Sequence, residues 1–170
     1  PLTNLTVIVP ADAWETTEAV KWAAGHEGPV YLRLSRMPVP DLDIPNRTFR
    51  PGHAEIVRQG NDLTIIAGGP TVHLAAAAAD LLAKDGVKAA IVSLPSFERF
   101  RAQPESYRFA TLGDAPRVAV EAGIAQGWHE FLRHKDRFVG LSDFGASAPA
   151  AKLFEHFGLT PAKVAETAKQ

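Results

Sequence analysis

Two arginines stand at the end of a short β-branched segment and could bind an anion. Arg33 and Arg36 end a strand that the sequence predicts over residues 30–34, and Ser35 lies beside Arg36. Ligands usually bind at the carboxyl ends of strands in open α/β sheets, and a guanidinium offers a planar fork of donors that suits phosphate. Alternation along the strand sends the two arginines to different environments. From the residues alone, a solvated Arg36 is favoured over a phosphate contact, and both remain open.

Two further positions deserve a functional reading. Glu121 ends the predicted strand 117–121, where a carboxylate could act as a general base. No nucleophile accompanies it, so a helix cap or a hydrogen bond at an interface is favoured. Gly68-Gly69 leads from a strand into a helix, which is a place that can hold a phosphate. Because the G-x-G-x-x-G spacing is missing, a tight structural turn is the favoured interpretation.

Metal and kinase chemistry find little support. His129 and His134 are five residues apart, whereas two ligands on one helix face are three or four apart. The sequence has no cysteine, which excludes disulfides, thiolate nucleophiles and Cys-ligated zinc. Asp143-Phe-Gly145 has the letters of the kinase metal motif, but no glycine-rich loop or H-R-D segment accompanies it. We therefore predict no metal ligand and no catalytic residue in this chain.

The composition predicts a globular chain without a polyanionic partner. Eighteen Lys and Arg against 19 Asp and Glu give a formal net charge of −1, so we expect no nucleic-acid partner. No apolar run reaches the roughly 20 residues that span a bilayer, so we expect no membrane association. The lack of cysteine fits a reducing, cytoplasmic location. The chain begins with Pro1 rather than Met, which suggests a fragment or a processed polypeptide.

The first part of the chain has the pattern of a β-α-β unit. Residues 6–9 are a short β-branched run, and Asp12 and Glu15 form a capping box that opens a helix. The helix ends before Gly28, and the strand 30–34 follows. The helical face that we expect to be buried carries Ala13, Thr17, Val20 and Ala24.

The remainder predicts a larger α/β domain after a linker. Four prolines among polar residues mark 37–51 as an extended connection. Beyond it, we expect strands at 63–67, 89–94, 117–121 and 138–141. We expect helices at 71–86, with Leu74, Ala78, Leu81 and Leu82 inward, at 107–112, around Trp128 and Phe131, after an N-cap at Ser147, and from Thr160. This alternation predicts a three-layer αβα fold with a mostly parallel sheet.

Several motifs together resemble the transketolase family. The four strongest, in register along the chain, are Pro10-Ala-Asp12, Gly28 to Arg36 (GPVYLRLSR), Arg117 to Gly123 (RVAVEAG) and Phe144 to Pro149 (FGASAP). The resemblance covers nearly the whole chain. It implies that residues 1–48 are the end of a pyrimidine-binding domain, with the linker from about 37, and that residues 52–170 are the family's C-terminal domain.

The resemblance also implies a function for the intact enzyme. Transketolases use thiamine diphosphate with Mg²⁺ or Ca²⁺ to move two-carbon ketol units between sugar phosphates, and they are homodimers. The family's cofactor and metal residues match nothing in this chain, so we expect no cofactor to bind it and no activity from it alone. Arg36 corresponds to the arginine that contacts the substrate phosphate, and Ser35 is a weaker neighbouring candidate. This reverses the preference for a solvated Arg36.

Two alternatives remain open. The chain could be the smaller subunit of a split transketolase or of a two-subunit ketoacid dehydrogenase, with the cofactor-binding half on another polypeptide. It could also be a non-catalytic interaction or regulatory module that keeps only the fold. Four aromatic residues could bury the C-terminal domain against neighbours, although core packing explains them equally well: Tyr107, Trp128, Phe144 and Phe154.

Overall fold

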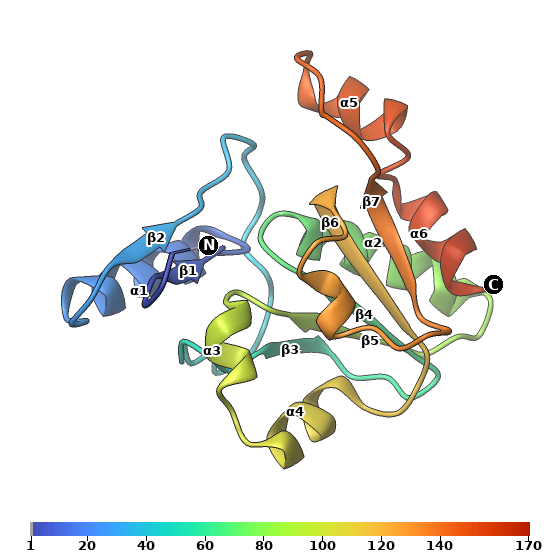
Figure 1. The fold of residues 1–170 in the computed structure, drawn as a ribbon. Coiled ribbons are helices and arrows are strands. Elements are labelled where there is room, and N and C mark those ends of the chain that lie inside the picture. The colour runs from blue at the N-terminus through green and yellow to red at the C-terminus, as the bar shows by residue number, and fades with distance from the viewer. Residues whose placement is uncertain (1) are drawn as a thin grey trace.

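The computed structural model describes residues 2–170, which form two separate sheets. A small two-stranded sheet with one helix comes first, and a five-stranded sheet with helices on both faces follows. Figure 1 shows the small unit standing beside the larger one, with helix α3 between them. The architecture is the predicted three-layer α/β fold with a partial α/β unit before it.

The N-terminal βαβ unit consists of β1 (Thr6–Ile8), α1 (Ala13–Ala24) and β2 (Val30–Leu32). Strands β1 and β2 are parallel, as the intervening helix requires. The predicted capping box is present with one change of partner. Asp12 accepts a hydrogen bond from the Glu15 N–H at 2.8 Å, while the Glu15 carboxylate reaches back to the N–H of Ala11 at 2.6 Å.

The expected buried face of α1 is wrong. Glu15 and Ala19 are the buried residues of this helix, and Val20 is 49% exposed. The reason is the position of Glu15, which must face inward to bond the Ala11 N–H and thereby turns its own side of the helix inward. The apolar stripe that we expected to be covered is exposed: Ala13, Thr17, Val20 and Ala24.

The five-stranded sheet has the order β3-β5-β4-β6-β7. Strands β4, β5, β6 and β7 are parallel, which confirms the mostly parallel prediction. Strand β3 runs antiparallel to β5 at one edge, and it was not predicted because its short run EIVR lies among polar residues. The bounds are β3 (Glu55–Arg58), β4 (Leu63–Ala67), β5 (Ala89–Ser93), β6 (Arg117–Ile124) and β7 (Arg137–Leu141).

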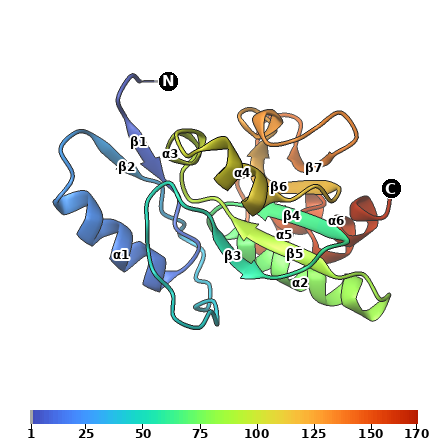
Figure 2. The ribbon, with the colours of Figure 1, turned by 90° about the horizontal axis from the view of Figure 1, so that it is seen from below.

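Helices cover both faces of this sheet, as Figure 2 shows from below. On one face, α2 (Thr71–Lys84) and α6 (Pro161–Ala168) pack on a core of alanines and branched residues. On the other face lie α3 (Phe97–Arg101), α4 (Glu105–Leu112) and the 3₁₀ turn η1 (Trp128–Glu130), over a core that includes Phe100 and Trp128. These two cores fix the carboxyl ends of the central strands.

Several helix predictions need correction. The helix expected around Trp128 and Phe131 is only the turn η1. Helix α5 (Ala150–His156) begins after Pro149 rather than with Ser147 as N-cap, because the fixed backbone of proline occupies the cap position. Helix α3 was not predicted. The inward face predicted for α2 is confirmed: Ala78 and Leu82 are buried in the core, and the half-buried Leu74 and Leu81 pack against it.

The proline-rich segment between the sheets is held by one arginine. Arg47 pairs with Asp12 at 2.5 Å and with Glu55 at 2.7 Å, and its side chain is only 6% exposed. Its guanidinium also lies 4.3 Å from the ring centroid of Trp14. We call this group the Arg47 clasp. It joins the start of α1 to β3 across the segment that the sequence predicts as a linker.

Candidate functional site

The predicted anion-binding residues lie together in one hollow of about 410 Å³. The hollow opens between the end of β2, the start of α2 and the end of β6. Arg33, Ser35, Arg36, Thr71 and Glu121 are its polar lining residues. We call it the arginine hollow. The alternation of the strand predicted different environments for Arg33 and Arg36, but both line this hollow. The reason is that β2 ends at Leu32, so its alternation does not continue to Arg36.

Arg36 is the uncommitted cation of the arginine hollow. Its side chain is exposed, and it makes no ion pair or side-chain hydrogen bond with any other residue of the segment 2–170. Ser35 is also exposed, and its Oγ accepts a hydrogen bond from the N–H of Met37 at 2.9 Å. The Ser35 hydroxyl proton remains available to a ligand. A guanidinium with its donors free is the arrangement that an anion requires.

Arg33, in contrast, is paired with Glu121. The Nη2 of Arg33 donates to both carboxylate oxygens of Glu121, at 3.1 and 3.2 Å. The arginine side chain is 47% exposed and the glutamate side chain 11%. Glu121 therefore makes the hydrogen bond between units that the sequence favoured over a role as general base. This pair joins the βαβ unit to the carboxyl end of β6.

A second hollow of about 480 Å³ lies on the other side of this pair. Its walls are mainly apolar and include Leu94, Phe97, Ile124 and Trp128. Arg33 and Glu121 line both hollows, so the ion pair forms the wall between them. Because the guanidinium of Arg33 is paired with the carboxylate of Glu121, this wall carries no net charge where the apolar hollow meets the arginine hollow.

The first turn of α1, behind loop 10–12, holds a buried acid, Glu15, which the sequence predicted only as part of a capping box. Burial raises the pKa of Glu15 to about 7, although the hydrogen bond from the Ala11 N–H opposes that shift. Burial would also raise the pKa of Asp12, but the N–H groups of Glu15 and Leu42 and the Arg47 guanidinium outweigh it and lower that pKa. His73 completes the enclosure of the loop, with Nε2 at 3.1 Å from the Ala11 carbonyl. The capping box located Glu15 in the sequence, but the burial of its carboxylate depends on the packing around loop 10–12.

Gly68-Gly69 forms the tight turn that the sequence favoured. Gly69 has a φ of +57°, and a Cβ placed on it would lie 2.8 Å from Cγ1 of Val9. The turn lets the end of β4 approach the end of β1. It shapes the junction of the two units, and the absence of a side chain at Gly69 is explained by this contact.

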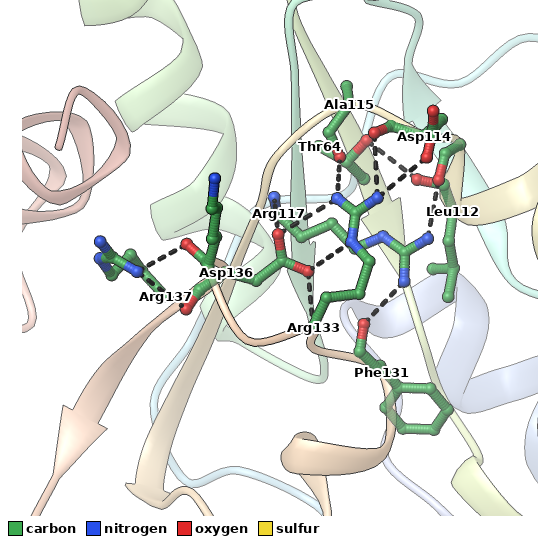
Figure 3. Close-up of polar contacts among 11 residues, drawn as sticks. Thr64, Leu112, Asp114, Ala115, Arg117, Phe131, Arg133, Asp136 and Arg137 are labelled. Carbon is green, nitrogen blue, oxygen red and sulfur yellow. Dashed lines mark hydrogen bonds and ion pairs between the residues drawn. The ribbon is translucent and has the colours of Figure 1, made fainter.

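The opposite end of β6 carries a polar cluster with a different character (Figure 3). Arg117 donates from Nη1 to the Phe131 carbonyl at 2.8 Å and from Nη2 to the Gly113 carbonyl at 2.7 Å. Asp136, with its side chain 2% exposed, accepts from the backbone N–H groups of Arg117 and Arg133 at 3.0 and 2.7 Å. The Arg133 guanidinium also pairs with Asp136 and lowers the pKa of that carboxyl against the effect of burial. This cluster joins loops at the amino ends of β6 and β7.

The histidines and aromatic residues considered in the sequence lie outside the arginine hollow, with one exception. His129 and His134 are exposed, and residues 2–170 contain no group of three or more His, Cys, Asp or Glu side chains placed to hold a metal ion. Phe144 is 93% exposed, and Trp128 is buried in the core. Phe154 is the exception, since it lines the arginine hollow from α5. None of the described helices is long and apolar enough to cross a membrane.

Comparison with known sequences supports the resemblance. The family model described as the transketolase-like C-terminal domain matches residues 53–160. The chain is 46% identical to a transketolase of Cereibacter sphaeroides over 98% of its length, and 44% identical to one of Sinorhizobium medicae over 92%. It spans only 26% and 24% of these two proteins, so it corresponds to about a quarter of each.

Solved structures agree. The chain aligns with a transketolase of Pichia stipitis in complex with sedoheptulose 7-phosphate, with a TM-score of 0.83, 34% identity, and coverage of 98% of this chain and 25% of that one. An inactive β4 tetramer of a split-gene transketolase aligns with a TM-score of 0.80 and 31% identity, over 99% of this chain and 58% of the other. Since the family model covers well over half of the 170 residues, the chain belongs to the transketolase-like C-terminal domain family.

Proposed function

We propose that this chain is the C-terminal part of a transketolase and that Arg36 binds the phosphate group of its sugar substrates. The observation that carries the proposal is the free guanidinium of Arg36 in the arginine hollow, beside an ion pair that already satisfies Arg33. The family membership supports the reaction class, which is the transfer of a ketol group between sugar phosphates. Ser35 adds a hydroxyl donor next to the same position.

The division of the chain follows the same proposal. Residues 1–48 are the end of a pyrimidine-binding domain, with its linker from about 37, and residues 52–170 are the C-terminal domain. Two separate sheets joined by a segment without strand or helix support this division. Thiamine diphosphate, when bound, supplies the electron sink for cleavage of the sugar, and a divalent metal such as Mg²⁺ holds its diphosphate. We propose that the residues that bind these two groups belong to other parts of the enzyme.

In this proposal the residues of the chain bind and orient the substrate. A phosphate in the arginine hollow accepts charge-assisted hydrogen bonds from Arg36 and one from Ser35. Such a contact holds the end of the sugar that does not react, so its free energy appears in substrate affinity rather than in the chemical step. The intact enzyme is proposed to be a cytoplasmic homodimer, which size-exclusion chromatography with light scattering would test.

A second candidate is the smaller subunit of a split transketolase. The specific observation in its favour is the split-gene relative, of which this chain covers 58%, compared with a quarter of the single-chain relatives. The sequence of the gene upstream of Pro1 distinguishes the two. An open reading frame that continues into cofactor-binding sequence supports the single chain.

Replacement of Arg36 tests the proposed site. In the full-length enzyme, Arg36→Met should raise KM for ribose 5-phosphate about 10- to 150-fold, because a charge-assisted contact to a phosphate contributes about 1.5–3 kcal/mol. KM for an unphosphorylated aldehyde should not change. Arg137→Met is the matched control, since Arg137 is an exposed arginine at the amino end of β7. An unchanged KM for the phosphorylated sugar in Arg36→Met overturns the proposal.

Cofactor binding gives an independent test. Titration of the 170-residue chain with thiamine diphosphate and Mg²⁺ should show no saturable heat of binding. Tight binding would contradict the assignment of the cofactor site to other parts of the enzyme.

A further inference from the structure

Arg36, which we propose to bind phosphate, follows three positions after Arg33, which is paired with Glu121. Arg33 ends the pairing of β2, with its N–H donating to the Ile8 carbonyl at 2.9 Å. Residues 34–36 follow and are exposed. The ion pair of Arg33 with Glu121 is therefore the fixed side-chain contact nearest to Arg36 on its N-terminal side, and we call this ion pair the tie.

The partner of that tie belongs to the other structural unit. Glu121 stands on β6 just beyond Val120, where the pairing of β6 with β4 ends. The Glu121 side chain is 11% exposed. Both of its carboxylate oxygens accept hydrogen bonds from one nitrogen of Arg33, Nη2. The carboxylate thus fixes the end of β2 relative to the five-stranded sheet, and the arginine hollow lies between these two parts.

Charge supports a division of roles between the two arginines. Glu121 neutralises Arg33, so the pair contributes no net charge to the hollow, and Arg36 is left as the cation that can meet an anion. We propose that Arg33 and Glu121 are positioning residues for Arg36, which hold its segment in place for the substrate phosphate. This inference rests on the proposed phosphate role of Arg36. Loss of the tie increases the freedom that Arg36 must lose when phosphate binds, which weakens binding.

The test must separate the loss of the Arg33–Glu121 contact from a change in the net charge of the hollow. Changing Glu121 alone would free a cation, and changing Arg33 alone would free an anion, so each single change also alters the field in the hollow. The double variant Arg33→Met/Glu121→Gln removes the tie and keeps the net charge. In the full-length enzyme, its KM for ribose 5-phosphate should rise about threefold, because half-exposed ion pairs contribute modest free energies. Its kcat, and its KM for an unphosphorylated aldehyde, should stay unchanged.

A charge-swapped pair provides the rescue. Arg33→Glu/Glu121→Arg has the same net charge and restores an ion pair across the junction, so KM should return toward that of the parent enzyme. Should the double variant fold poorly, Glu121→Asp serves instead: it keeps both charges, shortens the tie, and should raise KM about twofold. Thermal unfolding monitors the fold of each variant.

The outcomes distinguish this inference from the proposed function. If Arg36→Met raises KM and the charge-neutral double variant does not, Arg36 binds phosphate without help from the pair and the positioning role is overturned. If Arg36→Met leaves KM unchanged, the phosphate site itself is wrong. A rise in KM for phosphorylated and unphosphorylated substrates alike would indicate general damage to the junction and would also overturn the positioning role.

Discussion

The two ends of β6 use charged side chains in different ways. At the amino end, Asp136 binds the backbone N–H groups of Arg117 and Arg133 and the Arg133 guanidinium, and Arg117 donates to two backbone carbonyls while its buried Nε has no partner among residues 2–170, so the cluster holds the loops of the sheet. At the carboxyl end, Glu121 holds Arg33 but leaves Arg36 free. The difference indicates that a cluster bonded to the backbone of several loops stabilises the fold, while a single free cation beside a neutral pair is available to a ligand.

The largest expected effect comes from breaking the cluster at the amino end of β6. Asp136→Ala should lower the free energy of unfolding of the chain by about 3 kcal/mol, because it leaves the N–H groups of Arg117 and Arg133 without their acceptor and removes the ion pair with the Arg133 guanidinium. Urea unfolding followed by circular dichroism measures it. The control is Asp114→Ala, since Asp114 also pairs with Arg133 but is 86% exposed and should contribute little. Equal losses in both variants would contradict the comparison.

Glu15 sharpens the comparison because it is a buried acid whose carboxylate is not satisfied by a direct arginine contact. Its pKa is about 7 in the folded chain and near 4.5 when exposed, so the folded state binds the proton more tightly. The stabilising contribution is therefore complete below about pH 4.5 and is lost as the pH rises through 7. The loss should approach about 3 kcal/mol by pH 8, since one pKa unit corresponds to about 1.4 kcal/mol.

The measurement is the free energy of unfolding between pH 4.5 and 8 for the parent chain and for Glu15→Gln. Glutamine keeps an acceptor for the Ala11 N–H but cannot ionise, so the decline between these pH values should become much smaller. Glu18→Gln, three residues along the same helix, is the control and should keep the decline of the parent. Parallel curves for the parent and Glu15→Gln would show that Glu15 does not carry the effect.

A smaller effect concerns the turn beside the arginine hollow. Gly69→Ala should destabilise the chain by about 1 kcal/mol more than Gly86→Ala, because both positions have positive φ but only Gly69 brings the new Cβ against Val9. Thermal unfolding of the two variants compares them. If the two losses are equal, the approach of β4 to β1 is not tight at this point.

The smallest expected effect is at Arg36 itself. Arg36→Met should change the free energy of unfolding by less than about 0.5 kcal/mol, since exposed side chains away from special features contribute little to stability. Urea unfolding of this variant beside Asp136→Ala gives the comparison directly. A large loss of stability in Arg36→Met would mean that its side chain supports the fold, which would remove the contrast between the two ends of β6.

Much of the fold follows from local patterns in the sequence. The apolar runs of β4 and β5 and the cap at Thr160 predict their elements because burial on both faces and the first turn of a helix have strong residue preferences. Strand β3 and the buried face of α1 could not be predicted in this way. The first depends on pairing with β5, and the second depends on one hydrogen bond from Glu15.

The candidate site could be predicted only in part. The sequence indicated Arg36 and Ser35 through the family resemblance and Glu121 as an interface residue. It did not indicate that Glu121 pairs with Arg33, 88 residues earlier, because that contact depends on how the two sheets meet. The Arg47 clasp escaped prediction for the same reason, since Asp12, Arg47 and Glu55 come together only in the folded chain.

The Arg47 clasp has a consequence for movement within the enzyme. A segment rich in proline and without strand or helix has the composition of a hinge. Here Leu42 donates its N–H to Asp12 at 2.9 Å, and Arg47 binds Asp12 and Glu55 with its charge almost wholly enclosed. The start of α1 is therefore coupled through Arg47 to the edge strand β3, so a displacement of α1 would pull on β3 through two enclosed ion pairs.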